Sequence, residues 1–256
     1  MTPCSMPHVH RIARAQEAHA NLRVRGVAML AVAAMYMAAV PSARAAAPPR
    51  SIPGDAPINE PRRIAAAIVA ADRPAPALVV QVGAHHGEFL AEFLARFPTA
   101  RGLWIEPVND EGNLPIAKAR LAQFAPRVDY AFGCAARDIS DGCVPQGTDV
   151  IITDWVSVLQ NLDGIYRLYR LAAARLPVGG WMVNIDHVGF GGGEWDPRMK
   201  TARRGFRPDD EAPPVHHAEF RTPTADEQLG ALRAAGFDAQ VVWRSFDTVL
   251  IMGRKR

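Results

Sequence analysis

The chain has 256 residues, of which 49% are hydrophobic and 21% are charged. This composition suits one globular domain with a full hydrophobic core and leaves room for a tail. The net charge is +3, and much of the basic excess lies near the two ends. Because no basic stripe is interleaved with aromatic residues, nucleic acid is not the expected partner.

The cysteine count is low and odd: Cys4, Cys134 and Cys143. Without paired spacing, it argues against a disulfide framework and against a structural zinc site. Cys134 and Cys143 could pair, but we expect both to be ordinary small buried residues.

The segment 23–45 has the three parts of a secretory signal peptide: arginines, an apolar run from Val27 to Val40, and an A-x-A pattern after Pro41. The run is shorter than the roughly 20 residues that span a bilayer, so no stable membrane span is expected. About two dozen residues precede the arginines, which is long for a signal peptide. Export through this segment and a downstream start with a cytoplasmic protein therefore both remain open.

Three regions follow from these patterns. Residues 1–47 form a signal-like or disordered extension, and residues 48–59 form a linker rich in Pro and Ala. The folded domain is expected over residues 60–256.

Within that domain, helix-like and strand-like segments alternate. Apolar residues at helical spacing predict helices at 60–71, 87–97, 114–125, 162–176 and 224–237. Apolar, β-branched runs predict strands at 77–83, 101–108, 128–136, 148–155, 180–188, 238–245 and 246–255. We expect an α/β fold with a seven-stranded, mostly parallel sheet, helices on both faces and a C-terminal antiparallel hairpin.

The loop after the first strand lies where open α/β sheets bind ligands, at the carboxyl ends of the strands. It reads "QVGAHHG", from Gln81 to Gly87. Gly83 can adopt backbone conformations closed to other residues and lets a ligand approach the main chain, and Gly87 permits tight packing at the helix start. Glu106 follows at the end of the second strand, where a carboxylate can accept both hydroxyls of a ribose. Together these features predict a cofactor that contains a nucleoside.

These segments resemble class I S-adenosylmethionine-dependent methyltransferases. "QVGAHHG" aligns with the family's first motif, and "QVGAHHGEF" with "WIEPV" is closer still to the FkbM-like variant. "FGCAARDIS", "TDVIITDWVSVLQNL", "LYRLAAARLPVGGWMVNID" and "TADEQLGALRAAGF" are similar to later motifs, so the resemblance extends over roughly 60–255.

The resemblance implies a Rossmann-like fold and S-adenosylmethionine as the cofactor. The residues implied to contact it are Gln81, Gly83, Ala84, His85, Gly87, Glu106, Cys134, Asp138 and Asp154. Three of these depart from the family. Gln81 replaces the acid that contacts the methionine portion, and His85 replaces the middle glycine. Cys134 stands where many members have an adenine-contacting Asp, for which Asp138 is the alternative.

A nicotinamide dinucleotide is the competing cofactor. The sequence "GAHHGE" lacks the G-x-G-x-x-G triplet, and Glu88 at the helix start would repel a pyrophosphate. A methyl donor without phosphate suits this loop better.

Methyl transfer needs positioning and, for a hydroxyl acceptor, removal of a proton. The candidates follow the fourth and fifth strands: Asp154, Trp155, Asp186 and His187. His187 could act as the general base, with Asp186 or Asp154 orienting it. The alternative is that Asp154 contacts the cofactor or caps the next helix, and that His187 is structural.

The segment 189–222 is long, irregular and rich in Gly, Pro and charge, which is typical of a binding loop or of disorder. Residues that could shape an acceptor pocket there are Trp195, Arg204, Phe206, His216 and His217. Adjacent histidines point in different directions in an extended chain, so we expect no metal site at His216–His217 with Asp186, nor at His85–His86.

The sequence thus predicts methyl transfer from S-adenosylmethionine to a small molecule, with oxygen as the preferred acceptor atom. The alternative is an exported, non-catalytic protein on a methyltransferase-like scaffold.

Overall fold

The computed structural model describes residues 59–256 except 108–110, 135–138, 140–141, 192 and 207–220. The predicted signal segment, most of the linker, Asp138, His216 and His217 lie outside the described residues. The region boundaries drawn from the sequence stay predictions. Within the described part of the chain, no helix has the length and apolar character that a membrane crossing requires.

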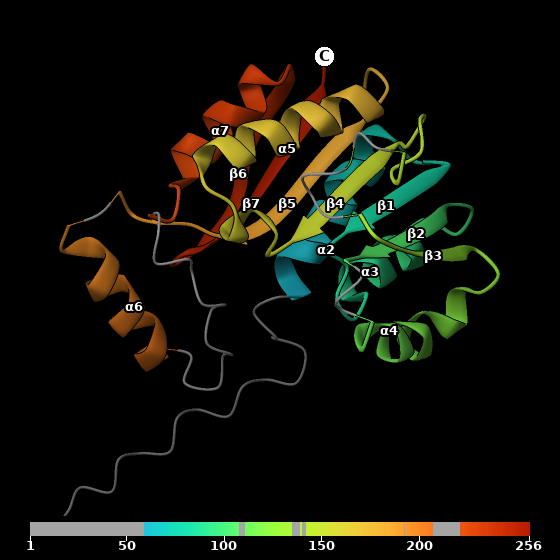
Figure 1. Cartoon of the computed structure of the whole chain (residues 1–256), viewed down its shortest axis with the longest axis horizontal. Coiled ribbons are helices and arrows are strands. Elements are labelled where there is room, and N and C mark those ends of the chain that lie inside the picture. Colours follow the sequence, from blue (N-terminus) through green and yellow to red (C-terminus); the bar gives the residue numbers. More distant parts are fainter. Residues whose placement is uncertain (1–58, 108–110, 135–138, 140–141, 192, 207–220) are drawn as a thin grey trace, which may run out of the picture. The chain divides into compact units, whose positions relative to one another are not determined.

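A seven-stranded sheet forms the centre of the domain (Figure 1). Its strands run in the order β3-β2-β1-β4-β5-β7-β6. The bounds are β1 Leu78–Val82, β2 Arg101–Glu106, β3 Val128–Phe132, β4 Val150–Asp154, β5 Trp181–His187, β6 Phe237–Ser245 and β7 Thr248–Lys255. The first five strands are parallel, and β7 is antiparallel to both β5 and β6. The predicted sheet with its closing hairpin is confirmed.

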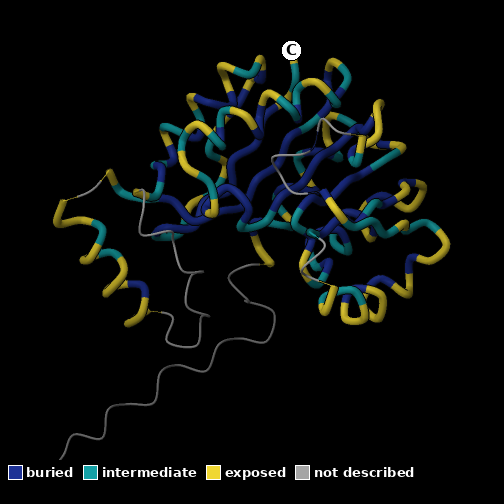
Figure 2. Tube along the Cα trace, viewed as in Figure 1, coloured by how far each residue is buried: buried dark blue, intermediate teal, exposed yellow. Residues whose placement is uncertain are grey.

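Helices cover both faces of the sheet, as Figure 1 shows. One core cluster joins the sheet to α5 (Leu162–Arg175) and α7 (Ala225–Ala234). The other joins it to α2 (Asn59–Asp72), α3 (Glu88–Arg96) and α4 (Asn113–Leu121), which a short turn η3 (Ala122–Phe124) follows. Figure 2 shows the buried strands between exposed helix surfaces. The strands read as continuous apolar runs because both of their faces are covered.

One helix was not expected. The segment 189–222 was predicted to be irregular, yet α6 occupies Trp195–Phe206 within it. Arg203 is the residue that this helix buries. Trp195, Met199 and Phe206 do recur at helical spacing, but the Gly, Pro and charged residues of the segment led to the irregular prediction. The side chain of Asp196 accepts a hydrogen bond from the backbone N–H of Phe190 at 2.7 Å, near the start of α6.

The prediction for the cysteines was wrong. Cys134 and Cys143 form a disulfide, with their Cα atoms 5.8 Å apart. Cys134 follows the end of β3, and Cys143 precedes β4. A spacing of nine residues alone does not predict that they pair.

Candidate functional site

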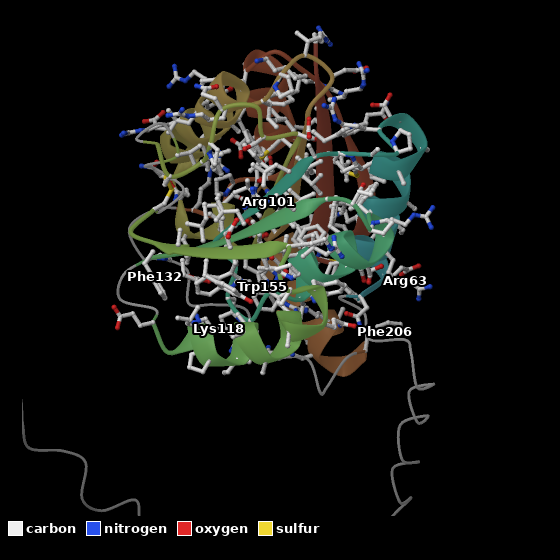
Figure 3. All side chains as sticks on the ribbon, turned by 90° about the vertical axis from the view of Figure 1, so that its right-hand side faces the viewer. Arg63, Arg101, Lys118, Phe132, Trp155 and Phe206 are labelled. Atoms are coloured by element: carbon white, nitrogen blue, oxygen red, sulfur yellow. A yellow bond between two sulfur atoms is a disulfide. The ribbon has the colours of Figure 1, made fainter. Side chains whose placement is uncertain are left out.

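The carboxyl ends of β1, β2, β4 and β5 and the turn between β6 and β7 lie at one edge of the sheet. Three residues other than glycine have a positive φ there: His85 at 44°, Trp155 at 57° and Phe246 at 54°. Backbone strain of this kind costs about 1–3 kcal/mol per residue and gathers at functional sites. The edge is therefore the candidate site, and Figure 3 labels Trp155 and Phe206 among its side chains.

Gln81 supports the first loop from below. Its side chain is buried, and its Oε1 accepts the backbone N–H of Leu90 at 2.9 Å. Leu90 lies in the first turn of α3, whose N-cap residue, Gly87, has no side chain to serve that turn. Gln81 thus caps the first turn of α3 from outside the helix. Its predicted contact with the cofactor stays a prediction.

Both glycines of the loop are required by packing. Gly83 has a φ of 67°, and a Cβ there would overlap Cγ2 of Val156, from the segment after β4. Gly87 has a φ of 77°, and its Cβ would lie 2.9 Å from Cδ1 of Leu121. Ala84 between them is fully buried. The structure explains these residues by close approach of neighbouring side chains, and it leaves their cofactor contacts as predictions.

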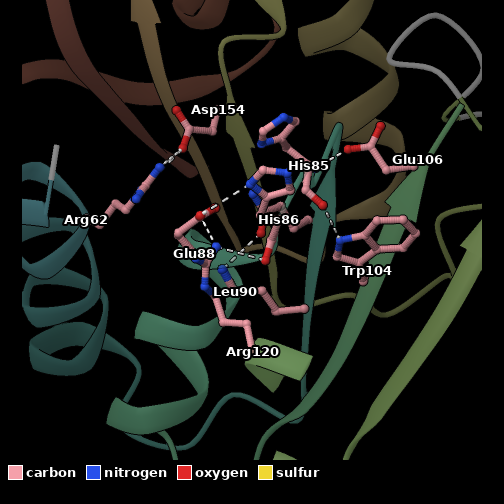
Figure 4. A network of polar contacts seen from close by, with 10 residues as sticks. Arg62, His85, His86, Glu88, Leu90, Trp104, Glu106, Arg120 and Asp154 are labelled. Atoms are coloured by element: carbon pink, nitrogen blue, oxygen red, sulfur yellow. Dashed lines mark hydrogen bonds and ion pairs between the residues drawn. The ribbon is translucent and has the colours of Figure 1, made fainter. Parts of the chain in front are cut away.

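The loop is tied to the end of β2 (Figure 4). The carboxylate of Glu106 accepts the backbone N–H of His85, and Nε1 of Trp104 donates to the backbone oxygen of His85 at 3.0 Å. Glu106 therefore lies against the loop that the sequence paired with it.

The two loop histidines do not point in different directions, contrary to our expectation. The rings of His85 and His86 lie side by side, tilted by 34°, with their centroids 3.7 Å apart, and His85 has a left-handed backbone conformation. Potential ligand atoms of His85, His86 and Glu88 lie within 4.8 Å of one another. Glu88 also pairs with Arg120, so this cluster already contains a cation (Figure 4).

Asp154 forms an ion pair with an arginine from the first helix. Nη2 and Nε of Arg62 donate to Oδ2 of Asp154 at 2.5 and 3.2 Å (Figure 4). Oδ1 of Asp154 is buried, and no described residue is its hydrogen-bond partner. The pair thus places both signs of charge at the end of β4.

Asp186 holds the turn that follows β4. Its carboxylate accepts the backbone N–H groups of Ser157 at 2.6 Å and of Val158 at 3.1 Å, and the hydroxyl of Ser157. These residues begin η5 (Ser157–Leu159). Burial raises the pKa of Asp186 to about 6, although Ser157 and His187 act to lower it. Asp186, rather than Asp154, caps the segment after β4.

His187 is 1% exposed and ends β5. Its Nδ1 lies 3.5 Å from Oδ2 of Asp247 and 3.4 Å from the hydroxyl of Thr248. Its ring lies beside that of Trp155, with centroids 5.3 Å apart. Asp247, which the sequence analysis did not suggest, is the acid beside Nδ1, whereas Asp154 pairs with Arg62 and Asp186 accepts from Ser157 and Val158. The predicted orienting roles of Asp154 and Asp186 stay predictions.

Sequence reasoning missed Asp247 and Arg203. Nη1 of Arg203, on α6, lies 3.3 Å from Oδ2 of Asp247. Asp247 follows Phe246 in the turn of the last hairpin, and only the antiparallel register places that turn beside the end of β5. Of the residues expected to shape an acceptor pocket, Trp195, Arg204 and Phe206 are exposed.

The hairpin side of the edge has three of the six buried polar atoms that lack a hydrogen-bond partner among the described residues. They are Nε2 of His187, Nε1 of Trp155 and Oδ1 of Asp247, and Oδ1 of Asp154 at the end of β4 is a fourth. Buried polar groups in folded proteins are nearly always paired, so each such atom requires an explanation. One explanation is a ligand that forms hydrogen bonds with these atoms.

Cys134, proposed for the adenine side, is fully buried and disulfide-bonded. It therefore has no free thiol in this structure, and its contact with the cofactor stays a prediction.

No protein-family model matches the chain, and no curated protein matches it. Solved structures do match its fold. An O-methyltransferase family protein from Burkholderia thailandensis is 14% identical with a TM-score of 0.59, over 77% of this chain and 56% of that one. Human N-acetylserotonin methyltransferase in complex with S-adenosylmethionine is 17% identical with a TM-score of 0.54, over 77% and 52%.

A "possible exported protein" from Bordetella parapertussis is 15% identical with a TM-score of 0.59, over 77% of this chain and 68% of that one. The chain spans little more than half the length of the methyltransferases that it matches. At these identities the likeness is one of fold. The described domain therefore has the fold of class I S-adenosylmethionine-dependent methyltransferases, with their mixed seven-stranded sheet.

Proposed function

We propose that the protein transfers a methyl group from S-adenosylmethionine to a hydroxyl group of a small molecule. The observation that supports this best is His187 at the end of β5, with Nδ1 facing a carboxylate and a buried Nε2 without a partner. An imidazole with one nitrogen held and the other available is the usual form of a general base.

The residues at the edge fit the cofactor in part. Glu106 lies against the loop after β1, where it would hold the ribose. Arg62 and Asp154 offer opposite charges, suited to the carboxylate and the ammonium group of the methionine portion. Gln81 is committed to Leu90 and supplies no charge, so we assign that end of the cofactor to the Arg62–Asp154 pair.

The acceptor atom follows from the base. When bound, the cofactor supplies an electrophilic methyl group on sulfur. A carboxylate acceptor needs no base, whereas a hydroxyl must lose its proton as its oxygen bonds to the methyl carbon and the carbon–sulfur bond breaks. His187 would take that proton on Nε2. A buried histidine ready to accept a proton therefore favours oxygen in an alcohol or a phenol.

Calorimetric titration of the whole chain with S-adenosylmethionine and S-adenosylhomocysteine tests the proposal. We expect micromolar binding, and Glu106→Ala should weaken it at least tenfold. Asp129→Asn is the matched control, because Asp129 is an exposed acid on the neighbouring strand, paired with Arg101. A folded protein that binds neither compound would contradict the proposal.

A second candidate is an exported, non-catalytic protein on this scaffold. The disulfide between Cys134 and Cys143 favours it, because disulfides persist mainly in oxidising compartments. A solved structure of similar fold, from Bordetella parapertussis, has the description "possible exported protein". Sequencing the mature N-terminus and counting free thiols in cell fractions separates the candidates. Cleavage near Ala46 with an intact disulfide supports export, and a reduced cytoplasmic protein opposes it.

A further inference from the structure

Three charged or titratable side chains meet below the hairpin turn, and each comes from a different element. His187 ends β5, Asp247 lies between β6 and β7, and Arg203 is on α6. Their side chains are 1%, 8% and 10% exposed. Charged groups this far from water are retained only where they are paired. These three side chains thus form a buried charged cluster at the edge of the sheet.

The carboxylate of Asp247 is kept ionised by its two neighbours. Burial acts to raise the pKa of Asp247, but the hydrogen bond from His187 and the charge of Arg203 act to lower it, and the pKa lies below its ordinary value. At neutral pH this carboxylate therefore presents lone pairs only, and it can accept but not donate.

That property decides which ring nitrogen of His187 holds the proton. A neutral imidazole has one N–H and one lone pair. Nδ1 faces Oδ2 of Asp247, so a lone pair there would be repelled while an N–H is attracted. The hydroxyl of Thr248, 3.4 Å from the same nitrogen, can either donate or accept and imposes no preference.

We propose that Asp247 is a positioning residue that keeps the proton on Nδ1 of His187 and so leaves Nε2 as the proton acceptor, with Arg203 of α6 holding the carboxylate in place. This inference rests on the proposed function for its purpose, but the state of the ring can be measured without it.

Trp155 narrows the class of acceptor. Its indole N–H is a donor without a described partner, and its ring lies beside that of His187. The two rings thus offer one unpaired donor and, in the inferred tautomer, one unpaired acceptor. A hydroxyl group both accepts and donates a hydrogen bond, so a neutral hydroxyl satisfies the pair. A carboxylate, which only accepts, would face the lone pair of Nε2 and the charge of Asp247.

Nitrogen NMR of the full-length protein, labelled at histidine, measures the tautomer directly. The spectrum is recorded at about pH 8, well above the ~6.5 of an ordinary imidazole. His187→Gln identifies the signals, since the chain has eight histidines. We expect the proton on Nδ1 in the unchanged protein. A proton on Nε2 overturns the inference without any further variant.

Two matched variants complete the test. Asp247→Ala removes the carboxylate that attracts the proton of Nδ1, so the proton should no longer be held on Nδ1. Thr248→Val keeps the branched shape and removes the other group near Nδ1, so it should leave the tautomer unchanged. If Asp247→Ala is folded and retains the Nδ1 proton, or Thr248→Val moves it, Asp247 does not set the tautomer.

The result is separable from the proposed function. Loss of cofactor binding in calorimetry would remove methyl transfer and leave the tautomer as measured. Conversely, cofactor binding with the proton on Nε2 would keep a methyltransferase and remove His187 as its base.

Discussion

The two sides of the site edge differ in how their polar groups are used. On the loop side, Gln81 is committed to Leu90, and Glu106 accepts a hydrogen bond from the loop backbone. On the hairpin side, Trp155 and His187 each retain a buried polar atom without a described partner. The comparison indicates that the polar groups of the loop side are used in internal contacts, whereas those of the hairpin side are in part available for hydrogen bonds.

The largest expected effect tests the packing of the loop. Gly83→Val places a side chain against Val156 at a residue whose φ is 67°. Overpacking and a left-handed β-branched residue each cost about 1–3 kcal/mol, so we expect the free energy of unfolding to fall by about 4 kcal/mol. Urea denaturation measures it.

A double variant separates the two causes of that loss. Val156→Ala in the Gly83→Val background should recover the overpacking part and leave the backbone part. If Gly83→Val is as stable as the unchanged protein, the contact with Val156 does not require a glycine at this position. The claim that internal packing holds the loop side would then fail.

The second effect concerns a buried acid on the hairpin side. The pKa of Asp186 is raised to about 6, so between about pH 4 and pH 6 the folded state binds this proton more tightly than the unfolded state does. The contribution of Asp186 to stability therefore falls as the pH rises through that range. Two pKa units correspond to about 3 kcal/mol.

Asp186→Asn removes this pH dependence. The difference in free energy of unfolding between the variant and the unchanged protein should thus move by about 3 kcal/mol in favour of the variant between pH 4 and pH 7. Urea denaturation at the two pH values measures it, and the titrating groups that do not interact with Asp186 cancel in the difference. A difference that is constant with pH would mean that Asp186 titrates in the folded protein as it does in the unfolded chain.

Most of the fold could be predicted because its signals are local. Apolar runs such as 77–83 report buried strands, and Thr224 followed by Glu227 forms the capping box that starts α7. Helix α6 escaped prediction because the Gly, Pro and charged residues of 189–222 outweighed the helical spacing of Trp195, Met199 and Phe206. The pairing of Cys134 with Cys143 depends on where β3 ends, which spacing does not state.

Only those parts of the candidate site could be predicted in which residues of one sequence motif also contact each other in the structure. The pairing of the first loop with Glu106 was predicted from a spacing along the chain, and the two are in contact. Asp247 and His187 lie 60 residues apart in sequence. Only the antiparallel register of β5 and β7 brings them together, and nothing local in "SFDTV" reports it.

A third effect tests whether α6 belongs to the hairpin side. Arg203→Met removes the cation beside Asp247 and leaves that carboxylate with His187 alone. Breaking a partly solvated buried ion pair should lower the free energy of unfolding by about 2 kcal/mol. It should also expose α6 to proteases, because the Arg203–Asp247 pair joins this helix to the hairpin beside the ring pair of Phe206 and Phe246.

Arg204→Met is the matched control for that variant, because the neighbouring Arg204 is exposed on the same helix. It should change neither stability nor the rate of cleavage within α6. Equal effects of the two variants would mean that the charge of Arg203 is not what holds the helix to the turn.

The smallest effect returns to the loop side, at Gln81. Gln81→Met keeps the length and the burial of the side chain but removes the acceptor for the N–H of Leu90. Loss of a helix cap costs about 1 kcal/mol, and urea denaturation should show a decrease of that size. Gln240→Met on β6, where Gln240 is exposed, provides a control that should change stability little. If Gln81→Met leaves stability unchanged while weakening S-adenosylmethionine binding, then Gln81 serves the ligand more than the helix. The loop side and the hairpin side would then no longer differ in this way, because residues of both sides would contact the same ligand.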